Sequence, residues 1–317
     1  MTEVKAKDFG KVLVLMGGWS AEREISLNTG KAVLKALKES NVDSEGFDLT
    51  ADNLETLKSI EFDRAFIALH GMGGEDGFIQ TFLETLNIPY TGSDANASAV
   101  CINKAKTKSI WKDMGISTPD YVIVDSNTLE DAVIETIQLP AVIKPVFEGS
   151  SLGISIVHNH DQISPAIKNA MSYGQQVLVE SFVQGSEYTV GILRGNALPM
   201  IRLEPSNEFY DYDAKYHSHE TLYHCPCGLE AEVEESISKI ALKSFSLTGA
   251  AGWGRVDLII DKFGQPWFIE VNTVPGMTDH SLVPMAAKHA GINFQELVLE
   301  ILATSLNKNI RKESETT

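Results

Sequence analysis

Residues 11–18 read KVLVLMGG, and residues 62–74 read FDRAFIALHGMGG. Each stretch is an apolar run that ends in a pair of glycines. Each is followed by a stretch with helical periodicity, at about 25–39 and 77–86. Strands that alternate with helices through short glycine-rich turns are typical of an open parallel sheet. Because ligands of such sheets lie beyond the carboxyl ends of the strands, both glycine pairs mark a candidate site.

Composition restricts the class of protein. The chain has 317 residues, a formal net charge of −17 and three cysteines. Such a charge disfavours a nucleic-acid partner, and the length suits two or three α/β domains. We find no apolar run long enough to span a membrane and no export signal, and we expect a cytoplasmic protein. Cys225 and Cys227 are too close for the usual zinc spacing, so we interpret them as ordinary residues.

Residues 255–272, RVDLIIDKFGQPWFIEVN, predict a β-hairpin. If Phe263 and Gly264 form its turn, Asp257 lies opposite Glu270. The same count places Arg255 opposite Asn272, and all four side chains lie on one face. Two carboxylates and an amide oxygen suit Mg²⁺. The alternative is a surface hairpin with its polar face in solvent, and a register shift of one residue would remove the site.

Three further segments are candidates for nucleotide binding. The loop EGSSLG at 148–153 follows Lys144 at a strand end, so its backbone N–H groups could surround phosphates, although such loops are often plain turns. A helix predicted at about 95–114 carries Lys104, which is a weaker candidate because most helix lysines are solvated. Glu180 and Glu187 follow an apolar strand, which fits an adenosine-binding edge or an ordinary strand end.

Four more features have both a functional and an ordinary interpretation. Residues 205–226 form a long polar and aromatic loop, typical of a lid, that includes Lys215 and Tyr216. Residues 275–282, PGMTDHSL, offer backbone donors and Ser281 for an oxyanion or a carboxylate. His70 is a site residue or a strand-end histidine. Glu22 binds an ammonium group or is a helix-start acid.

These segments together resemble the D-alanine–D-alanine ligases of the ATP-grasp superfamily. The matching stretches cover nearly the whole chain in order, and they are GGWSAEREISLNTG, FIALHGMGGEDG, IPYTGS, KPVFEGSSLGIS, FYDYDAKY, GWGRVDL and EVNTVPGMTDHSLVP. Trp19 and residues 101–103 depart from the family pattern. The resemblance implies an α/β protein in which an N-terminal open parallel-sheet domain (1–103) precedes a two-part ATP-grasp fold (104–187 and 188–317).

The resemblance also implies a reaction. ATP phosphorylates the carboxylate of one D-alanine, and the amine of a second D-alanine displaces the phosphate, which serves peptidoglycan precursor synthesis. The family's metal ligands correspond to Asp257, Glu270 and Asn272, which would hold two Mg²⁺ ions, or Mn²⁺. Its ATP contacts correspond to Lys104, Lys144, Ser151, Glu180, Val183, Glu187 and Lys215.

The remaining roles are also taken from the resemblance. Glu22 and His70 would bind the first D-alanine, and Ser281 with the Leu282 backbone would bind the second. Arg255 and the Gly276 N–H would stabilise the oxyanion. A hydrogen-bonded triad would join Glu22, Ser150 and Tyr216. Family members are commonly homodimers, so we expect a homodimer that binds D-alanine and ATP.

Two other functions remain open at this stage. One is a related ligase that makes D-alanyl-D-lactate or D-alanyl-D-serine, although a tyrosine at position 216 favours the dipeptide of D-alanine. The other is a catalytically inactive nucleotide sensor or scaffold. That function predicts loss of metal ligands or lysines, and here the set is complete.

Overall fold

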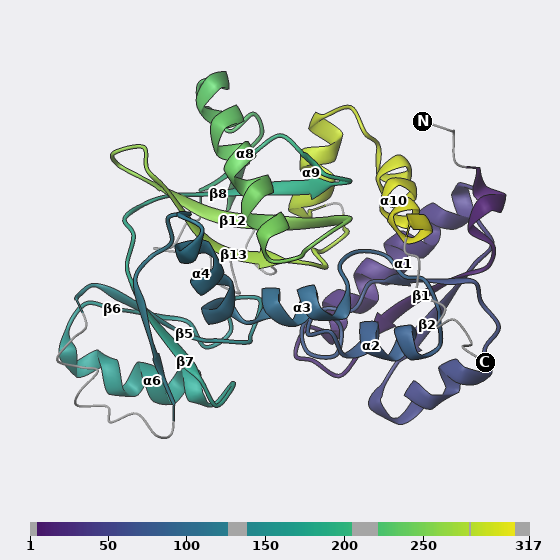
Figure 1. Cartoon of the computed structure of the whole chain (residues 1–317), viewed down its shortest axis with the longest axis horizontal. Helices are drawn as coiled ribbons and strands as arrows, with labels where there is room; N and C mark the ends of the chain where they lie inside the picture. Colours follow the sequence, from purple (N-terminus) through teal and green to yellow (C-terminus); the bar gives the residue numbers. More distant parts are fainter. Residues whose placement is uncertain (1–4, 126–137, 205–220, 279, 308–317) are drawn as a thin grey trace, which may run out of the picture.

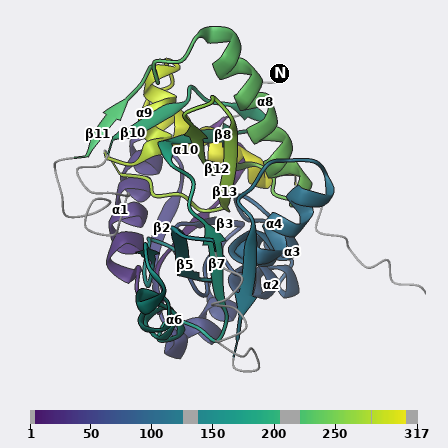
Figure 2. The ribbon, with the colours of Figure 1, turned by 90° about the vertical axis from the view of Figure 1, so that its left-hand side faces the viewer.

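The computed structural model describes residues 5–125, 138–204, 221–278 and 280–307, in which three β-sheets are surrounded by helices (Figure 1). Figure 2 shows α8 and α6 at opposite ends of the molecule. The predicted α/β class, with a parallel N-terminal sheet, is confirmed. No helix in these ranges is long and apolar enough to cross a membrane.

The N-terminal sheet has the strand order β2-β1-β3, and all its strands are parallel. Its elements are β1 (Val12–Gly17), α1 (Arg23–Glu39), β2 (Ser44–Leu49), β3 (Arg64–Ile67) and α2 (Phe78–Thr85). Every residue of β1 is buried, which explains its continuous apolar run. β3 is shorter than the predicted strand at 62–69, since it pairs with β1 only through Ile67.

The second sheet is antiparallel and has the strand order β4-β7-β5-β6. Its elements are β4 (Tyr121–Val124), β5 (Ala141–Pro145), β6 (Ser155–Val157), α6 (Ile163–Met171) and β7 (Val177–Ser181). Ile163, Ile167 and Ala170 lie on one face of α6 and are fully buried against this sheet. The sequence LEDAVIETI at 129–137 predicts a helix between β4 and β5, but these residues lie outside the described ones.

The largest sheet has the order β11-β10-β8-β12-β13, and β9 pairs with β8. Its elements are β8 (Gly185–Leu193), β9 (Asn196–Ala197), β10 (Ile201–Glu204), β11 (Leu222–His224), α8 (Ala231–Leu247), β12 (Trp253–Asp261) and β13 (Pro266–Asn272). The prediction of one loop over 205–226 is wrong at 222–224. These residues form β11 because their backbone pairs with β10, for example His224 with Arg202.

The helix predicted at 95–114 is two helices, α3 (Ala95–Ile102) and α4 (Lys104–Asp113). Asn103 breaks it, because its backbone is extended and its side chain accepts a hydrogen bond from the Lys106 N–H at 3.0 Å. The Lys104 N–H then donates to the Val146 carbonyl at 3.2 Å. The break therefore turns Lys104 inward, to 6% exposure.

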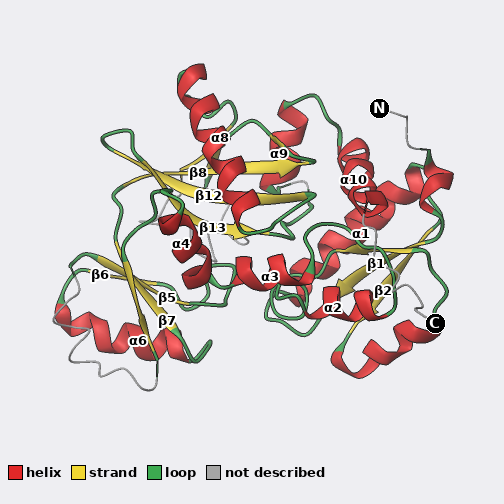
Figure 3. Cartoon of the chain, in the orientation of Figure 1, coloured by secondary structure: helices red, strands yellow, loops and turns green. Residues whose placement is uncertain are grey.

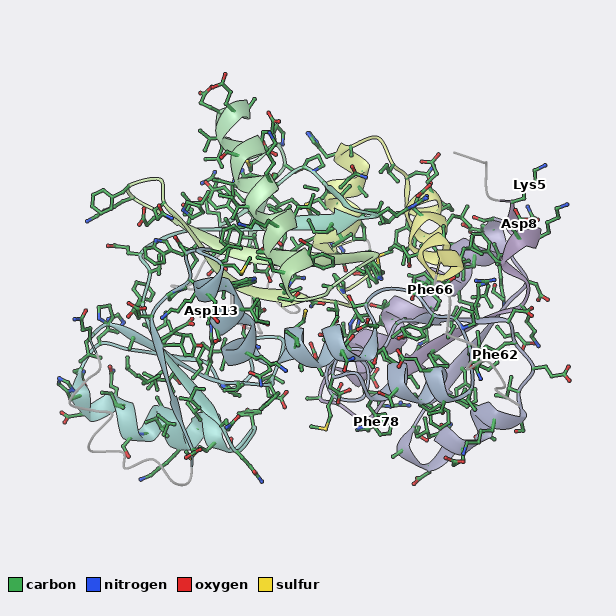
Figure 4. All side chains as sticks on the ribbon, viewed as in Figure 1. Lys5, Asp8, Phe62, Phe66, Phe78 and Asp113 are labelled. Carbon is green, nitrogen blue, oxygen red and sulfur yellow. The ribbon has the colours of Figure 1, made fainter. Side chains whose placement is uncertain are left out.

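The main core joins the two ends of the described chain. The last helices, α9 (Leu282–His289) and α10 (Phe294–Ala303), contribute buried side chains to the same apolar cluster as β1 and α1. Figure 3 shows α10 beside α1, next to the N-terminal sheet. Phe66, labelled in Figure 4, is fully buried in this cluster. The C-terminal helices thus fix the large sheet against the N-terminal one.

Candidate active site

The hairpin of β12 and β13 supplies the centre of the site. Arg255 pairs with Asn272 and Asp257 with Glu270, as predicted. The predicted two-residue turn at Phe263 and Gly264 is wrong. The Asp261 N–H donates to the Gln265 carbonyl, so three residues form the turn. A β-bulge between Asp257 and Leu258 offsets this difference and restores the predicted pairing at the site.

Two ion pairs lie on the polar face of this hairpin. Arg255 binds Asp257 with two nitrogens, at 2.8 and 2.7 Å, and Thr189 Oγ1 donates to the same carboxylate at 2.6 Å. Lys104 Nζ lies 3.2 Å from Glu270 Oε2. Both carboxylates keep about a fifth of their side-chain surface exposed, at 23% for Asp257 and 22% for Glu270. These front ion pairs are therefore accessible to ligands.

Behind them lies a buried cluster of Lys144, Glu180 and Lys108, which we call the rear cluster. Glu180 contacts Lys144 at 2.5 Å and Lys108 at 3.0 Å. Burial alone would raise the pKa of Glu180, but the two lysines outweigh it and lower the pKa below its usual value. Burial lowers the pKa of Lys108 to about 8, against the opposing effect of Glu180.

Lys144 and Glu180 line a first cavity between the small and large sheets. The predicted nucleotide residues Ser151, Val183 and Glu187 also line this cavity. So do the predicted metal ligands Asp257 and Glu270 and the predicted oxyanion donor Arg255. The apolar side chains of Ile154, Ile156 and Leu258 also line it. An apolar slot that ends at cations has the shape and chemistry that a nucleotide requires.

A second cavity adjoins the first and is more polar. Its walls carry the remaining described candidates, which are Glu22, His70, Lys104, Ser150, Asn272, Gly276, Ser281 and Leu282. Arg255, Glu270 and Leu282 line both cavities. A molecule in one cavity can therefore meet a molecule in the other at the front ion pairs.

The loop that follows β5 connects the second cavity to Glu22. Ser150 and Ser151 both have left-handed backbone conformations, with φ of 50° and 60°. Such conformations cost about 1 kcal/mol each and are concentrated at ligand-binding sites. The Ser150 hydroxyl donates to the Glu22 carboxylate. The predicted Ser150–Glu22 contact is thus present, whereas Tyr216 and Lys215 lie outside the described residues.

Glu22 lies near a buried histidine–carboxylate pair. His70 Nδ1 is 2.9 Å from the Val274 carbonyl and 3.5 Å from Glu75, and its Nε2 is 3.0 Å from the Thr29 hydroxyl. Burial lowers the pKa of His70, but Glu75, Glu22 and the Val274 carbonyl together outweigh burial, and the net pKa is raised. Burial raises the pKa of Glu75. These contacts fix the imidazole at the edge of the second cavity.

The segment before α9 also lines the second cavity, through Gly276, Thr278 and Ser281. Ser281 Oγ accepts a hydrogen bond from the Thr278 N–H at 2.9 Å. A Cβ atom at Gly276 would lie 2.9 Å from Ser281 Oγ, so a side chain at position 276 would collide with Ser281. Glycine therefore keeps this backbone open towards the cavity.

Sequence reasoning did not identify Lys108, Glu75 and Thr189 as parts of the site. Lys108 is four residues after Lys104, so helical spacing places both on one face, but the predicted single helix suggested solvated lysines. Glu75 directly follows the second glycine pair. Nothing in the sequence near Thr189 shows that it lies opposite Asp257, because that pairing depends on the order of strands.

Over nearly its whole length, this chain is similar in sequence to proteins of a known family. Family models described as D-ala D-ala ligase N-terminus and C-terminus match residues 48–93 and 110–303. A D-alanine–D-alanine ligase of Methylococcus capsulatus is 50% identical over 95% of this chain and 97% of its own.

Two solved structures have the same architecture. The D-alanine–D-alanine ligase of Bacillus anthracis complexed with ATP is 33% identical, covers 93% of this chain and 96% of its own, and has a TM-score of 0.81. The VanG D-Ala:D-Ser ligase of Enterococcus faecalis is 28% identical, covers 93% and 99%, and has a TM-score of 0.83.

The three sheets and the two adjoining cavities define an ATP-grasp ligase. Within that class, the chain belongs to the D-alanine–D-alanine ligase family.

Proposed function

We propose that this chain joins two D-alanine molecules into D-alanyl-D-alanine and converts ATP into ADP and phosphate. The observation that carries the proposal is that Arg255 and Glu270 line both cavities. Phosphoryl transfer from a nucleotide to a carboxylate requires the two substrates to meet in line at one point. The front ion pairs lie at that point.

In the first cavity, Lys144 and Ser151 would bind the phosphates of ATP. Lys104, from the second cavity, and Lys215 would be further phosphate ligands. The Val183 backbone, Glu180 and Glu187 would hold adenosine. The Glu180 carboxylate is also paired with two lysines, so it would in addition fix these cations beside the nucleotide. The ribose hydroxyls are then assigned to Glu187.

The donor set on the hairpin fits the expected Mg²⁺ ions. Asp257, Glu270 and Asn272 offer carboxylate and amide oxygens from two paired strands, and all three line a cavity. Among the described residues, no three histidine, cysteine, aspartate or glutamate side chains form a metal-binding group, so phosphate oxygens and water would complete each shell. Two Mg²⁺ ions, or Mn²⁺, would neutralise the charge that develops on the phosphates.

In the second cavity, Glu22 and His70 would hold the first D-alanine with its carboxylate towards the γ-phosphate. Transfer of that phosphoryl group gives D-alanyl phosphate and ADP. Ser281 and the Leu282 backbone would bind the carboxylate of the second D-alanine. Its amine attacks the acyl carbon, phosphate leaves, and the amine proton is lost. Arg255 and the Gly276 N–H would stabilise the oxyanion formed in this step.

The loop that carries Ser150 would exclude water from the second cavity. D-alanyl phosphate hydrolyses in water, so the cavity must close during the reaction. Ser150 lines the second cavity and donates to Glu22, which supports a role of this loop in closing the cavity. Tyr216 would complete the triad.

Three further properties belong to the same proposal. The protein acts in the cytoplasm on peptidoglycan precursors, as a homodimer. Its domains are 1–103, 104–187 and 188–317, a division supported by the three sheets. The main core argues for contact between the first and last domains, since both contribute to it.

The test is phosphate release from ATP and Mg²⁺ with D-alanine, L-alanine, D-lactate and D-serine, singly and in pairs, with products identified by mass. We expect release that requires D-alanine, and the dipeptide as product. A mixed product with D-lactate or D-serine would change the identity of the second substrate. A D-Ala:D-Ser ligase has the same fold, so the residues of the pocket and not the fold determine that substrate. No release with any amino acid would overturn the proposal.

A further inference from the structure

Lys108 is the most deeply buried cation of the described residues, with no exposed surface. Lys108 is not among the described residues that line the two cavities, so it does not touch a ligand bound there. Its ammonium contacts Glu180 Oε2 at 3.0 Å and Thr118 Oγ1 at 2.7 Å. Any effect of Lys108 on a ligand therefore passes through these two neighbours.

The first neighbour leads to the nucleotide cavity. Glu180 divides its carboxylate between Lys108 and Lys144, and Lys144 lines the cavity. Two cations and one anion leave a single positive charge in the rear cluster. Without Lys108, both carboxylate oxygens of Glu180 could pair with Lys144, so less of the Lys144 charge would face the phosphates.

The second neighbour leads to the hairpin. Thr118 Oγ1 donates to the Phe268 carbonyl at 2.8 Å, and the Phe268 N–H donates to the Ser117 carbonyl at 2.9 Å. Phe268 pairs with Leu258, directly beyond the β-bulge, and Glu270 pairs with Asp257 before it. The contacts of Lys108 thus end at the bulge that determines where Glu270 points.

A purely stabilising role explains Lys108 poorly. Removing a lysine from water has a large free-energy cost that a buried ion pair often fails to offset, and apolar residues of the same volume are frequently as stable. Burial that lowers the pKa of Lys108 reflects this cost. A function at the adjoining cavity accounts for a charge held there.

We propose that Lys108 is a positioning residue for the ligase reaction: through Glu180 it keeps the Lys144 charge available to the nucleotide, and through Thr118 it holds the β13 bulge beside Glu270. The inference rests on the proposed function, because it takes the first cavity as the ATP site.

The test compares Lys108→Met with Lys106→Met. Lys106 is on the same helix and exposed, so it is a matched control. Binding of ADP with Mg²⁺ is measured by calorimetry, and the KM for D-alanine by phosphate release. We expect about ten- to a hundredfold weaker ADP binding in Lys108→Met, the size of one charged hydrogen bond. We expect a KM for D-alanine within about threefold of the control.

A double variant separates transmission through Glu180 from loss of structure. In a Glu180→Gln background, Lys144 is no longer paired with a carboxylate, so adding Lys108→Met should weaken ADP binding less than about threefold. This comparison also serves if Lys108→Met alone does not fold, since the Glu180→Gln background removes the buried carboxylate that Lys108→Met leaves with one cation fewer. Far-ultraviolet circular dichroism checks the fold of each variant.

The outcomes are distinct. Equal ADP binding in Lys108→Met and Lys106→Met overturns the inference, as does the same loss in the wild-type and Glu180→Gln backgrounds. Parallel losses of ADP and D-alanine binding also overturn it, because they indicate general structural damage. Failure of the wild-type chain to bind ADP contradicts the proposed function instead.

Discussion

The front ion pairs and the rear cluster both consist of basic side chains paired with carboxylates, but they differ in exposure. At the front, Arg255 binds Asp257 and Lys104 approaches Glu270, and both carboxylates are partly exposed between the two cavities. At the rear, Lys144, Glu180 and Lys108 are each almost fully buried. One front pair, Arg255 with Asp257, lies within one strand. The other front pair, Lys104 with Glu270, and both rear pairs join segments far apart in the chain.

Exposure decides what each set can do. A partly exposed ion pair is worth little free energy, so its groups can exchange partners when a phosphate or a metal ion arrives. A buried pair loses several kcal/mol when one partner is removed, so its geometry stays fixed. We infer that the front side chains exchange their ion-pair partners for substrate or metal ligands. The rear cluster keeps the cavity wall behind them in a fixed geometry.

The largest expected effect is at the front. Glu270→Gln keeps the shape of the side chain and removes the charge that a metal ion would bind. We expect turnover to fall at least about a thousandfold, several kcal/mol of transition-state stabilisation, while the thermal unfolding temperature stays close to wild type. Phosphate release measures turnover. Glu235→Gln, at an exposed pair with Lys239, is the control. Unchanged activity in Glu270→Gln would contradict the exchangeable front pairs.

Arg255→Met should have the next largest effect. Arg255 lines both cavities, so its loss removes a donor at the point where the substrates meet. We expect kcat to fall about a hundred- to a thousandfold, the typical result of removing one oxyanion donor. Steady-state kinetics with D-alanine give kcat and KM, and Arg194→Met, paired with Glu300, is the control. A raised KM for ATP with an unchanged kcat would place Arg255 in ground-state binding only.

The two regions also differ in how far the sequence predicts them. The alternation of charged and apolar residues at 255–272 predicts the cross-strand partners of Arg255 and Asp257, but not the Lys104–Glu270 pair. The prediction succeeded although its turn was wrong, because the three-residue turn and the bulge have opposite effects on register. Local alternation determines which face a side chain occupies, but it does not show where an extra residue leaves the ladder.

The rear cluster was not predictable in this way. A lysine on a helix is usually solvated, and Lys108 is buried because α4 packs against β7 and β13. The break at Asn103 is also a tertiary effect, since the extended backbone there lets Lys104 reach Val146. Contacts between segments far apart in the chain leave no periodic pattern. The resemblance to a family therefore covered the cavity-lining residues and not the side chains behind them.

A smaller effect tests whether the rear cluster supports the hairpin. Thr118→Val keeps the volume but removes the hydroxyl between Lys108 and the Phe268 carbonyl. Both buried partners would lose a hydrogen bond, so we expect the free energy of unfolding to fall by about 1–3 kcal/mol. Urea denaturation measures this, with Thr85→Val, an exposed helix-end hydroxyl, as control. ADP binding should weaken less than in Lys108→Met because the pair with Glu180 remains. A stability equal to that of the control would remove Thr118 from the support of β13.

The smallest effect is a pH shift from the charge balance of the rear cluster. Glu180 faces Lys108 and Lys144, Glu270 acts on Lys108 at longer range, and the folded pKa of Glu180 is below the unfolded value of 4.5. Its ionised form therefore contributes stability that is fully present above pH 4.5 and is lost as the pH falls through the folded pKa. Lys108→Met removes one of the two cations that lower this pKa, so the loss begins at higher pH. We expect its acid-unfolding midpoint, followed by tryptophan fluorescence, to lie a few tenths of a pH unit above that of Lys106→Met. Identical midpoints would mean that Lys144 alone keeps Glu180 ionised, and that the two rear cations are not equivalent.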